Sequence, residues 1–385
     1  MIKYIKEISP TLLIRGLILF FHLIISIIIS NIYGNDILGE YIYLQAILYF
    51  SSNFCSLGAE FYIFENSFNK LYSQSILFSI VLLIVLFLSD LLLSFDSLNY
   101  IIIFLIPFQT YLRIHSIYFL KKKNQFNFLL FEKLLPLLIS IIITCIFIFL
   151  EHKLNVSLVI LISLFLTLFV MYPFKIKSSF EFLNLNLTYK SFERYSATFP
   201  QKLFVLSESL IINFIFGLDA LGQYSIISKF PKLITLLNES FIIRYTSMFH
   251  KLIAEKKFTD LNRLLLKNLK FNLIIVILYI SIIIMIWDFL YIIWPTVDFE
   301  SLRYILYILF IAYAIDIFAG PLARILLFMN KNFLVFSSNL LGVILFFILI
   351  NLLNIEKGLI IYSISVLNYF LLINIKNFLH YKNLS

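Results

Sequence analysis

The sequence predicts an all-α polytopic membrane protein with about 12 transmembrane helices, arranged as two pseudo-symmetric six-helix lobes around a central cavity. Hydrophobic residues make up 62% of the 385 positions, against roughly 45–50% in soluble domains. Charged residues are only 13%, about half the usual share, so the chain cannot cover a water-facing surface and we expect lipid to be its solvent. Long apolar runs and one motif that occurs twice also support this fold class.

Twelve apolar runs are long enough to cross a bilayer, since about 20 mostly apolar residues span roughly 30 Å of hydrocarbon. Only helices and closed barrels satisfy every backbone group in lipid, and barrel strands are too short and alternating to match these runs. The predicted spans are residues 12–33, 38–64, 72–94, 98–120, 128–150, 154–174, 200–217, 221–246, 271–294, 302–329, 333–353 and 357–378.

The distribution of lysine and arginine predicts both termini on the cytoplasmic side. In that orientation the cytoplasmic segments hold 20 basic residues and the opposite face holds 3, an imbalance that follows the positive-inside rule. The net charge of +9 therefore reflects topology, and we expect no nucleic-acid partner. The run Lys121–Lys123 is a topology determinant that we expect to contact anionic membrane lipids.

Six spans in each half give the second half the same orientation as the first. The halves should therefore be parallel repeats, related by a pseudo-twofold axis along the membrane normal. The predicted division is an N-terminal lobe at 1–174, a polar cytoplasmic linker at 175–199 and a C-terminal lobe at 200–385.

The motif G-x-D-x-L-G-x-Y occupies residues 34–41 and recurs at 217–224, 183 residues later. In each copy the first glycine can end a helix in a left-handed conformation, and the aspartate can cap the next helix. The second glycine allows close helix approach, and the tyrosine suits the membrane interface. A well-made tight turn would explain these residues by itself, but a duplication at half the chain length indicates two similar lobes.

The chain resembles a known family. The resemblance is carried by the basic N-terminal segment, the early Arg15, the turn at 34–41, its second-half copy and the twelve spans. Together these features are similar to the Wzx-type O-antigen and capsular polysaccharide flippases of the multidrug/oligosaccharidyl-lipid/polysaccharide exporter superfamily.

The resemblance implies a flippase of the bacterial inner membrane. Its cargo would be an undecaprenyl-diphosphate-linked oligosaccharide, moved from the inner to the outer leaflet through a V-shaped cavity between the lobes. It also implies that other membrane proteins of polysaccharide assembly are partners of this chain.

Two lysines deep in span 8 are the main candidates for contact with an anionic ligand. Lys229 and Lys232 lie about 12 and 16 Å from the outer end of the span, at 1.5 Å per residue. A charge there costs at least roughly 2.5–3.5 kcal/mol, so it is a functional candidate by default. At 100° per residue both share a polar stripe with Ser225 and Ser228, as a cavity wall would. The equivalent stripe of span 2 comprises Tyr41, Gln45, Tyr49 and Ser52.

A buried salt bridge is the structural alternative for these lysines. Glu208 in span 7 lies at a similar depth and could hold spans 7 and 8 together. One glutamate cannot neutralise two lysines, so an anionic ligand would still meet a surplus positive charge.

Other charges inside spans have both functional and structural explanations. Arg15, Arg113 and Arg324 could each extend the cationic cavity. Arg15 lies near a cytoplasmic helix end, where snorkelling to water is the simpler explanation, whereas Arg113 and Arg324 lie deeper. Asp316 and His22 could bind a coupling H⁺ or Na⁺, although a helix–helix hydrogen bond is the simpler explanation for each.

The sequence contains no phosphate loop, metal-ligand cluster, nucleophile–base pair or dinucleotide fingerprint. We therefore expect no enzymatic activity, cofactor or metal, and an ion gradient as the driving force. One alternative is a cation-coupled drug or solute antiporter of the same superfamily, which would favour an acidic cavity. A membrane polysaccharide polymerase is less compatible, because the loops predicted outside the cytoplasm are short.

Overall fold

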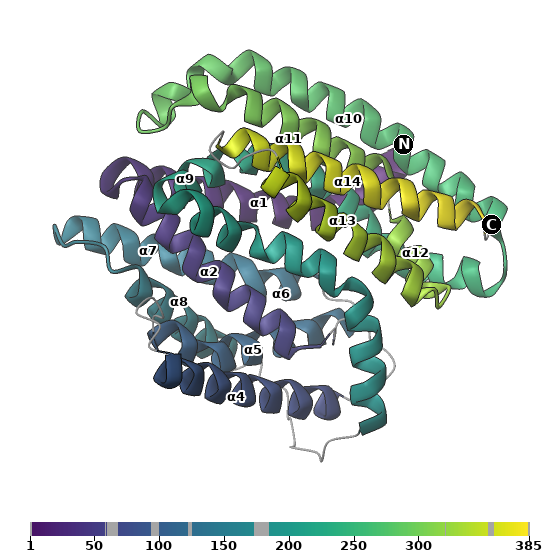
Figure 1. Cartoon of the computed structure of the whole chain (residues 1–385), viewed down its shortest axis with the longest axis horizontal. Helices are drawn as coiled ribbons and strands as arrows, with labels where there is room; N and C mark the ends of the chain where they lie inside the picture. Colours follow the sequence, from purple (N-terminus) through teal and green to yellow (C-terminus); the bar gives the residue numbers. More distant parts are fainter. Residues whose placement is uncertain are drawn as a thin grey trace.

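The computed structural model describes residues 2–57, 59, 68–93, 100–121, 125–172, 185–319, 321–352 and 358–383. Every regular element in these ranges is a helix, and the long helices lie side by side with alternating directions (Figure 1). This arrangement is what a lipid solvent requires, because a helix satisfies its own backbone.

Six passes of the described chain form the first lobe, and the second helix begins directly after the first. The fifth pass is composite, because a π-helical turn lies within it. The elements are α1 (Ile2–Tyr33), α2 (Asn35–Cys55), α4 (Phe68–Leu93), α5 (Tyr100–Lys121), α6 (Gln125–Leu129) with η1 (Leu130–Leu134) and α7 (Leu135–Phe149), and α8 (Val156–Met171).

Six further passes within the described residues form the second lobe. Its first element, α9 (Leu185–Ala254), contains two of them, since Gly217 interrupts the helical backbone. Pro321 precedes a short last segment of the fourth pass. The remaining elements are α10 (Phe258–Ile293), α11 (Phe299–Ala319) with α12 (Leu322–Phe328), α13 (Asn332–Leu352) and α14 (Leu359–Lys382).

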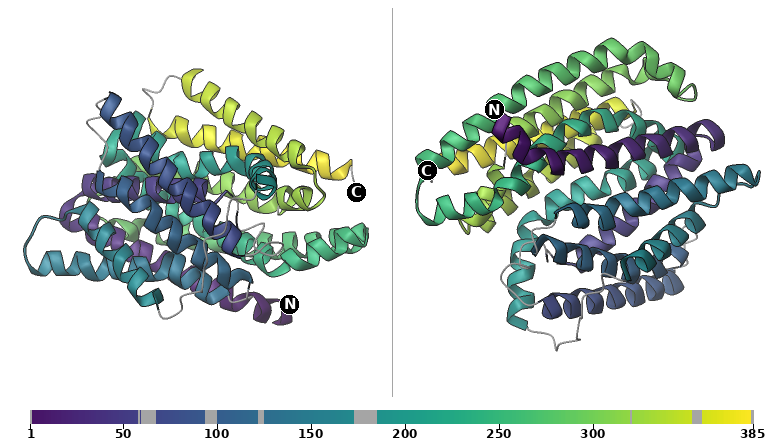
Figure 2. Two further views of the ribbon diagram at one scale, coloured as in Figure 1. Left: turned by 90° about the horizontal axis from the view of Figure 1, so that it is seen from below. Right: turned by 180° about the vertical axis from the view of Figure 1, so that it is seen from behind.

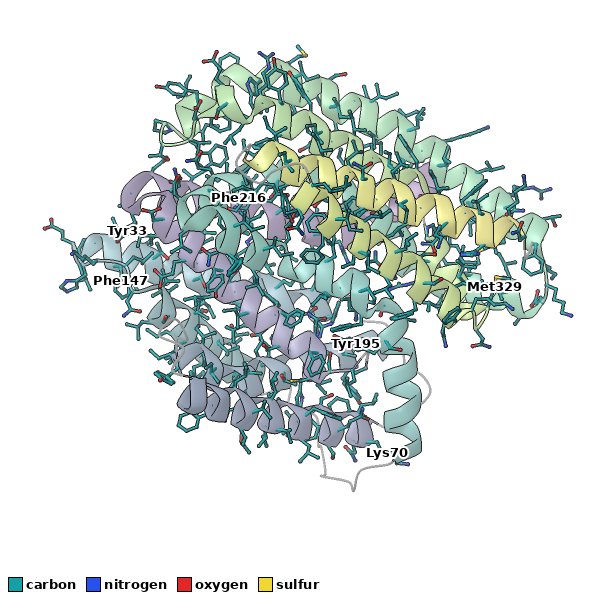
Figure 3. All side chains as sticks on the ribbon, viewed as in Figure 1. Tyr33, Lys70, Phe147, Tyr195, Phe216 and Met329 are labelled. Carbon is teal, nitrogen blue, oxygen red and sulfur yellow. The ribbon has the colours of Figure 1, made fainter. Side chains whose placement is uncertain are left out.

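The predicted fold class is confirmed. Nine stretches of the described chain are long and apolar enough to span a membrane; one of them, Tyr195–Thr235, covers two passes. The shorter apolar α8 and the more polar α2 complete the set of twelve. Figure 3 shows Tyr33 and Phe147 at one end of the molecule. We call it the outer end, because the basic residues predict that it faces away from the cytoplasm.

Several predicted boundaries are wrong. The stretch 185–199, predicted to be part of a polar loop, belongs to α9. In the other direction, α2 ends at Cys55 rather than at 64. Hydropathy locates the apolar part of a helix but cannot distinguish a polar helical extension from a loop.

The lobes meet along α1 and α2 of the first and α9 of the second, and these helices lie side by side in both views of Figure 2. The two copies of the duplicated turn face each other at this contact. A Cβ atom on Gly39 would clash with the backbone of Leu218, and one on Gly222 with the backbone of Asn35. Because Asn35 and Leu218 are themselves separated by 183 residues, the contact is reciprocal, as a pseudo-twofold axis requires.

The backbone of the turn is duplicated as well. Gly34 has φ 96° and ψ 166°, and Gly217 has φ 86° and ψ 176°, a region that only glycine populates readily. The predicted aspartate cap is wrong for α2, where Asp36 lies in the first turn and no side chain caps the helix. The predicted interfacial tyrosines are also misplaced, since Tyr41 and Tyr224 are 0% and 2% exposed. Both side chains are therefore part of the core.

Candidate functional site

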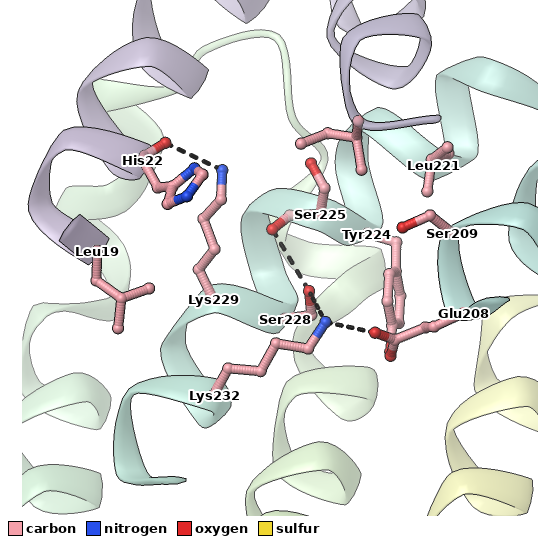
Figure 4. Close-up of a pocket in the computed structure, with 11 residues that line it drawn as sticks. Leu19, His22, Glu208, Ser209, Leu221, Tyr224, Ser225, Ser228, Lys229 and Lys232 are labelled. Carbon is pink, nitrogen blue, oxygen red and sulfur yellow. Dashed lines mark hydrogen bonds and ion pairs between the residues drawn. The ribbon is translucent and has the colours of Figure 1, made fainter. Parts of the chain in front are cut away.

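A cavity of about 200 Å³ lies between the lobes (Figure 4). It is formed where α1 and α2 meet both passes of α9. α1 contributes Leu19 and His22, and α2 contributes Ile42. The part of the wall that belongs to α9 comprises Glu208, Ser209, Leu221, Tyr224, Ser225, Ser228, Lys229 and Lys232.

Lys229 crosses from one lobe to the other. Its side chain is 8% exposed, and its Nζ donates to the main-chain oxygen of His22 at 3.2 Å (Figure 4). The same Nζ donates to Oγ of Ser26, which also belongs to α1. Ser26 can accept because its own hydroxyl hydrogen is directed at the oxygen of His22, 2.7 Å away. In the described part of the chain, no carboxylate lies within ion-pair distance of this ammonium group.

Lys232 is held within the second lobe instead. Its Nζ lies 2.5 Å from Oε2 of Glu208 and 3.4 Å from Oγ of Ser228. The hydroxyl of Tyr224 donates to the other carboxylate oxygen of Glu208 at 2.5 Å. The Tyr224 ring also faces the ammonium group, 5.9 Å from Nζ to the ring centroid. The predicted salt bridge between spans 7 and 8 is thus present, with the lysine side chain about a third exposed.

The two lysines therefore differ in whether a negative charge lies next to the ammonium group. Lys232 forms an ion pair with Glu208, whereas the partners of Lys229 among the described residues are neutral oxygens. Hydrogen bonds to neutral acceptors compensate the desolvation of a buried ammonium group less well than an anion would. The cavity carries one more positive than negative charge among its lining residues if both lysines are charged.

The predicted polar stripe of α2 does not line this cavity. Tyr41, Gln45, Tyr49 and Ser52 are absent from its wall, where the α2 residue is Ile42. Gln45 instead donates to the Tyr41 hydroxyl at 2.7 Å. The four residues do share one face of α2, but this face is not the one directed at the cavity. The neighbouring apolar face, which contains Ile42, is directed at it instead.

The predicted arginines lie away from the cavity. Arg113 forms an ion pair with Glu132, a buried residue of η1 that the sequence interpretation missed, and donates to Ser56 Oγ at 3.3 Å. The charges of Arg324 and Glu132 both act on the guanidinium group of Arg15. Glu132 lies inside the predicted span 128–150, and an acid within an apolar span was the signal that could have identified it.

We expect the Arg113–Glu132 pair to be structural. Replacing Arg113 with leucine would leave the carboxylate of Glu132 buried without this partner, which costs roughly 3–5 kcal/mol. The melting temperature in detergent should fall clearly in Arg113→Leu. In Arg113→Leu/Glu132→Leu it should return much of the way to that of the unmodified protein. If the double variant melts no higher than the single one, the pair does not act as a unit.

Asp316, a candidate for ion coupling, lies at the α11–α14 contact and accepts a long hydrogen bond from Asn374, at 3.4 Å. It is not among the cavity residues, whereas His22, the other candidate, is. Sequence reasoning also missed Tyr224 as a partner of Glu208 and Ser26 as a partner of Lys229. The duplicated motif pointed to Tyr224, but no sequence signal pointed to Ser26.

No protein-family model matches the sequence, and no curated protein matches it either. Solved structures do match. The chain is similar to an inward-facing multidrug resistance MATE family transporter of the MOP superfamily, with 14% identity, a TM-score of 0.62 and coverage of 94% of this chain and 93% of that one. It is equally similar to an outward-facing one, with 14% identity, a TM-score of 0.62 and coverage of 98% and 94%.

A third similar structure is the D35N mutant of the Vibrio cholerae MATE transporter VcmN, with 13% identity, a TM-score of 0.63 and coverage of 98% of this chain and 95% of that one. The chain therefore has the fold of MATE transporters over almost its whole length. The equal TM-scores for the inward-facing and outward-facing structures mean that similarity alone does not assign a conformational state.

Proposed function

We propose that this chain is a transporter that moves an undecaprenyl-diphosphate-linked oligosaccharide across the bacterial inner membrane by alternating access. The observation that carries the proposal is Lys229, a buried ammonium group at the lobe interface whose partners within the described ranges are neutral oxygens. A diphosphate would provide the anionic partner that this part of the protein interior does not provide.

The surroundings of Lys229 suit such a cargo. Ser209, Ser225 and Ser228 add hydroxyl groups to the wall and can exchange hydrogen bonds with sugar hydroxyls or phosphate oxygens. The cavity of about 200 Å³ is smaller than the roughly 300–1,000 Å³ usual for small-molecule pockets. An oligosaccharide thus requires the lobes to separate further, while the polyprenyl tail stays in lipid.

In this mechanism the predicted lobes, 1–174 and 200–385, rock against each other, so that the cavity opens to each side of the membrane in turn. No covalent step is needed, so the chain acts as a transporter and not as an enzyme. Protonation or Na⁺ binding at His22 or Asp316 would supply the coupling, since each is an ionisable group inside a helix of the membrane region.

A cation-coupled drug antiporter is the second candidate. Two observations favour it: two of the three similar structures are described as multidrug resistance transporters, and the interior carries the carboxylates Glu208 and Asp316. The positive surplus of the cavity favours the anionic cargo over a cationic drug, because a like charge in a low-dielectric site is repelled strongly.

A paired transport assay distinguishes the two. The purified chain is reconstituted into liposomes with either a fluorescent polyprenyl-diphosphate saccharide or the cationic dye ethidium, each with and without a pH or Na⁺ gradient. We expect the lipid-linked saccharide to change leaflets at least about tenfold faster than in empty liposomes, with no ethidium transport. Ethidium transport without movement of the saccharide would overturn the proposal in favour of the antiporter.

A further inference from the structure

The outer ends of the two lobes are joined by a set of hydrogen bonds that connects residues more than 260 positions apart. Asn31 Nδ2 donates to the main-chain oxygen of Ile293 at 2.8 Å, and Asn35 Nδ2 donates to that of Thr296 at 2.9 Å. The hydroxyl groups of Ser30 and Thr296 are 2.8 Å apart. Ser30 also donates to Oδ1 of Asn35 at 2.6 Å, which fixes the orientation of that amide.

The loop that receives these bonds is a rigid part of the second lobe. Trp294, only 2% exposed, packs edge-on against Phe230 of α9 at 6.2 Å and contacts Phe299 of α11 at 6.4 Å between ring centroids. Val297 is 2% exposed, and its main-chain N–H donates to the oxygen of Trp294 at 3.2 Å. A loop fixed in this way transmits movement of its lobe instead of absorbing it.

We propose that Ser30, Asn31 and Asn35 form, with the main chain at Ile293 and with Thr296, an outer gate that must break in every transport cycle. This inference rests on the alternating-access part of the proposed function, but not on the identity of the cargo. The backbone of Asn35 is also what Gly222 packs against, so the gate and the closest backbone approach of the lobes are at the same end.

The bonds are suited to a gate because they are neutral and small in number. Each such bond shifts the equilibrium between the closed and the open outer end by only about 2- to 12-fold. A bound ligand that favours the open state can therefore outweigh all three bonds together. On the first lobe Ser30 and Asn35 are buried, whereas Asn31 and, across the interface, Ile293 and Thr296 are exposed. Water can therefore reach the three bonds from the exposed side and replace them when the lobes separate.

The gate is tested by labelling a cavity residue from outside. In a Cys55→Ser/Cys145→Ser background, Ser209→Cys serves as the reporter, and a membrane-impermeant maleimide is applied to the outer face of oriented cells. Adding Ser30→Ala and Asn35→Ala removes two of the bonds between the lobes, so the labelling rate should rise about 4- to 140-fold.

Tyr33→Phe is the matched control. It removes a hydrogen bond at the same end, from the Tyr33 hydroxyl to the oxygen of His152 at 3.3 Å, but that bond lies within the first lobe. Its labelling rate should equal that of the reporter alone. Equal rates in Tyr33→Phe and in the Ser30→Ala/Asn35→Ala variant would overturn the gate.

A disulfide provides a second measurement that does not depend on the reporter. In the same background without Ser209→Cys, Ser30→Cys/Thr296→Cys should cross-link on oxidation, because the two hydroxyl groups are only 2.8 Å apart. Cross-linking should abolish transport reversibly, with recovery on reduction. Undiminished transport by the cross-linked chain would show that this end does not open, whereas failure of the cargo proposal would leave both labelling and cross-linking unchanged.

Discussion

Replacing Lys229 with glutamine should weaken binding of a diphosphate-bearing lipid about 10- to 100-fold and reduce its transport in proportion. A charge-assisted hydrogen bond to phosphate contributes roughly 1.5–3 kcal/mol, and glutamine offers only a neutral amide. Glutamine can still donate toward His22 and Ser26, so the fold should be kept. The measurement is a titration of the purified variant with undecaprenyl diphosphate, followed by the liposome assay.

Two further variants separate this effect from simple loss of charge. Lys270→Gln removes an exposed lysine of α10 and should leave both affinity and transport unchanged. Glu208→Gln/Lys232→Gln removes the neighbouring ion pair without changing the net charge, so it should retain affinity better than Lys229→Gln. If Lys229→Gln binds and transports normally at normal protein level, Lys229 has no part in recognition.

Gly39→Ala and Gly222→Ala should each prevent the outer ends of the lobes from closing. The new methyl group would meet the carbonyl carbon of Leu218 at 2.8 Å in the first variant, and that of Asn35 at 2.9 Å in the second, so the backbones must move apart. Overpacking of this kind costs typically about 1–3 kcal/mol, which shifts the population toward the open state by up to about 100-fold. Labelling of the cavity reporter from outside should rise, and transport should fall at least about tenfold.

Two other glycines serve as controls. Gly16 lies in α1, and a methyl group added there would have no neighbour within 4 Å, so Gly16→Ala should be neutral or slightly stabilising. Gly342→Ala would press on the Ile373 side chain at 2.8 Å within the second lobe, so it should lower stability without opening the gate. Different labelling in the Gly39 and Gly222 variants would contradict the pseudo-symmetric contact.

The number and order of the spans could be predicted from sequence because lipid imposes a strong constraint on every helix. The close approach at Gly39 and Gly222 could also be predicted, since small residues permit such contacts. The lysine positions followed from depth along span 8. These three predictions depend on local composition or on one helix at a time.

The parts that failed depend on how neighbouring helices are rotated and where they begin. Gly34 itself ends one helix and precedes the next, so Asp36 falls in the first turn and does not cap. Tyr41 is apolar enough for a core and polar enough for an interface, and only the packing of the helices around it makes it fully buried. One partner of Lys229 is a main-chain oxygen on another helix, which no residue pattern encodes.

A cryo-EM structure of the chain with bound undecaprenyl diphosphate tests the central claim most directly. We predict density for the diphosphate between α1 and α9, within hydrogen-bonding distance of Nζ of Lys229, with the tail leaving between the lobes. Density for the headgroup outside the cavity, with Lys229 still bonded to His22 and Ser26, would contradict the claim that this lysine recognises the cargo.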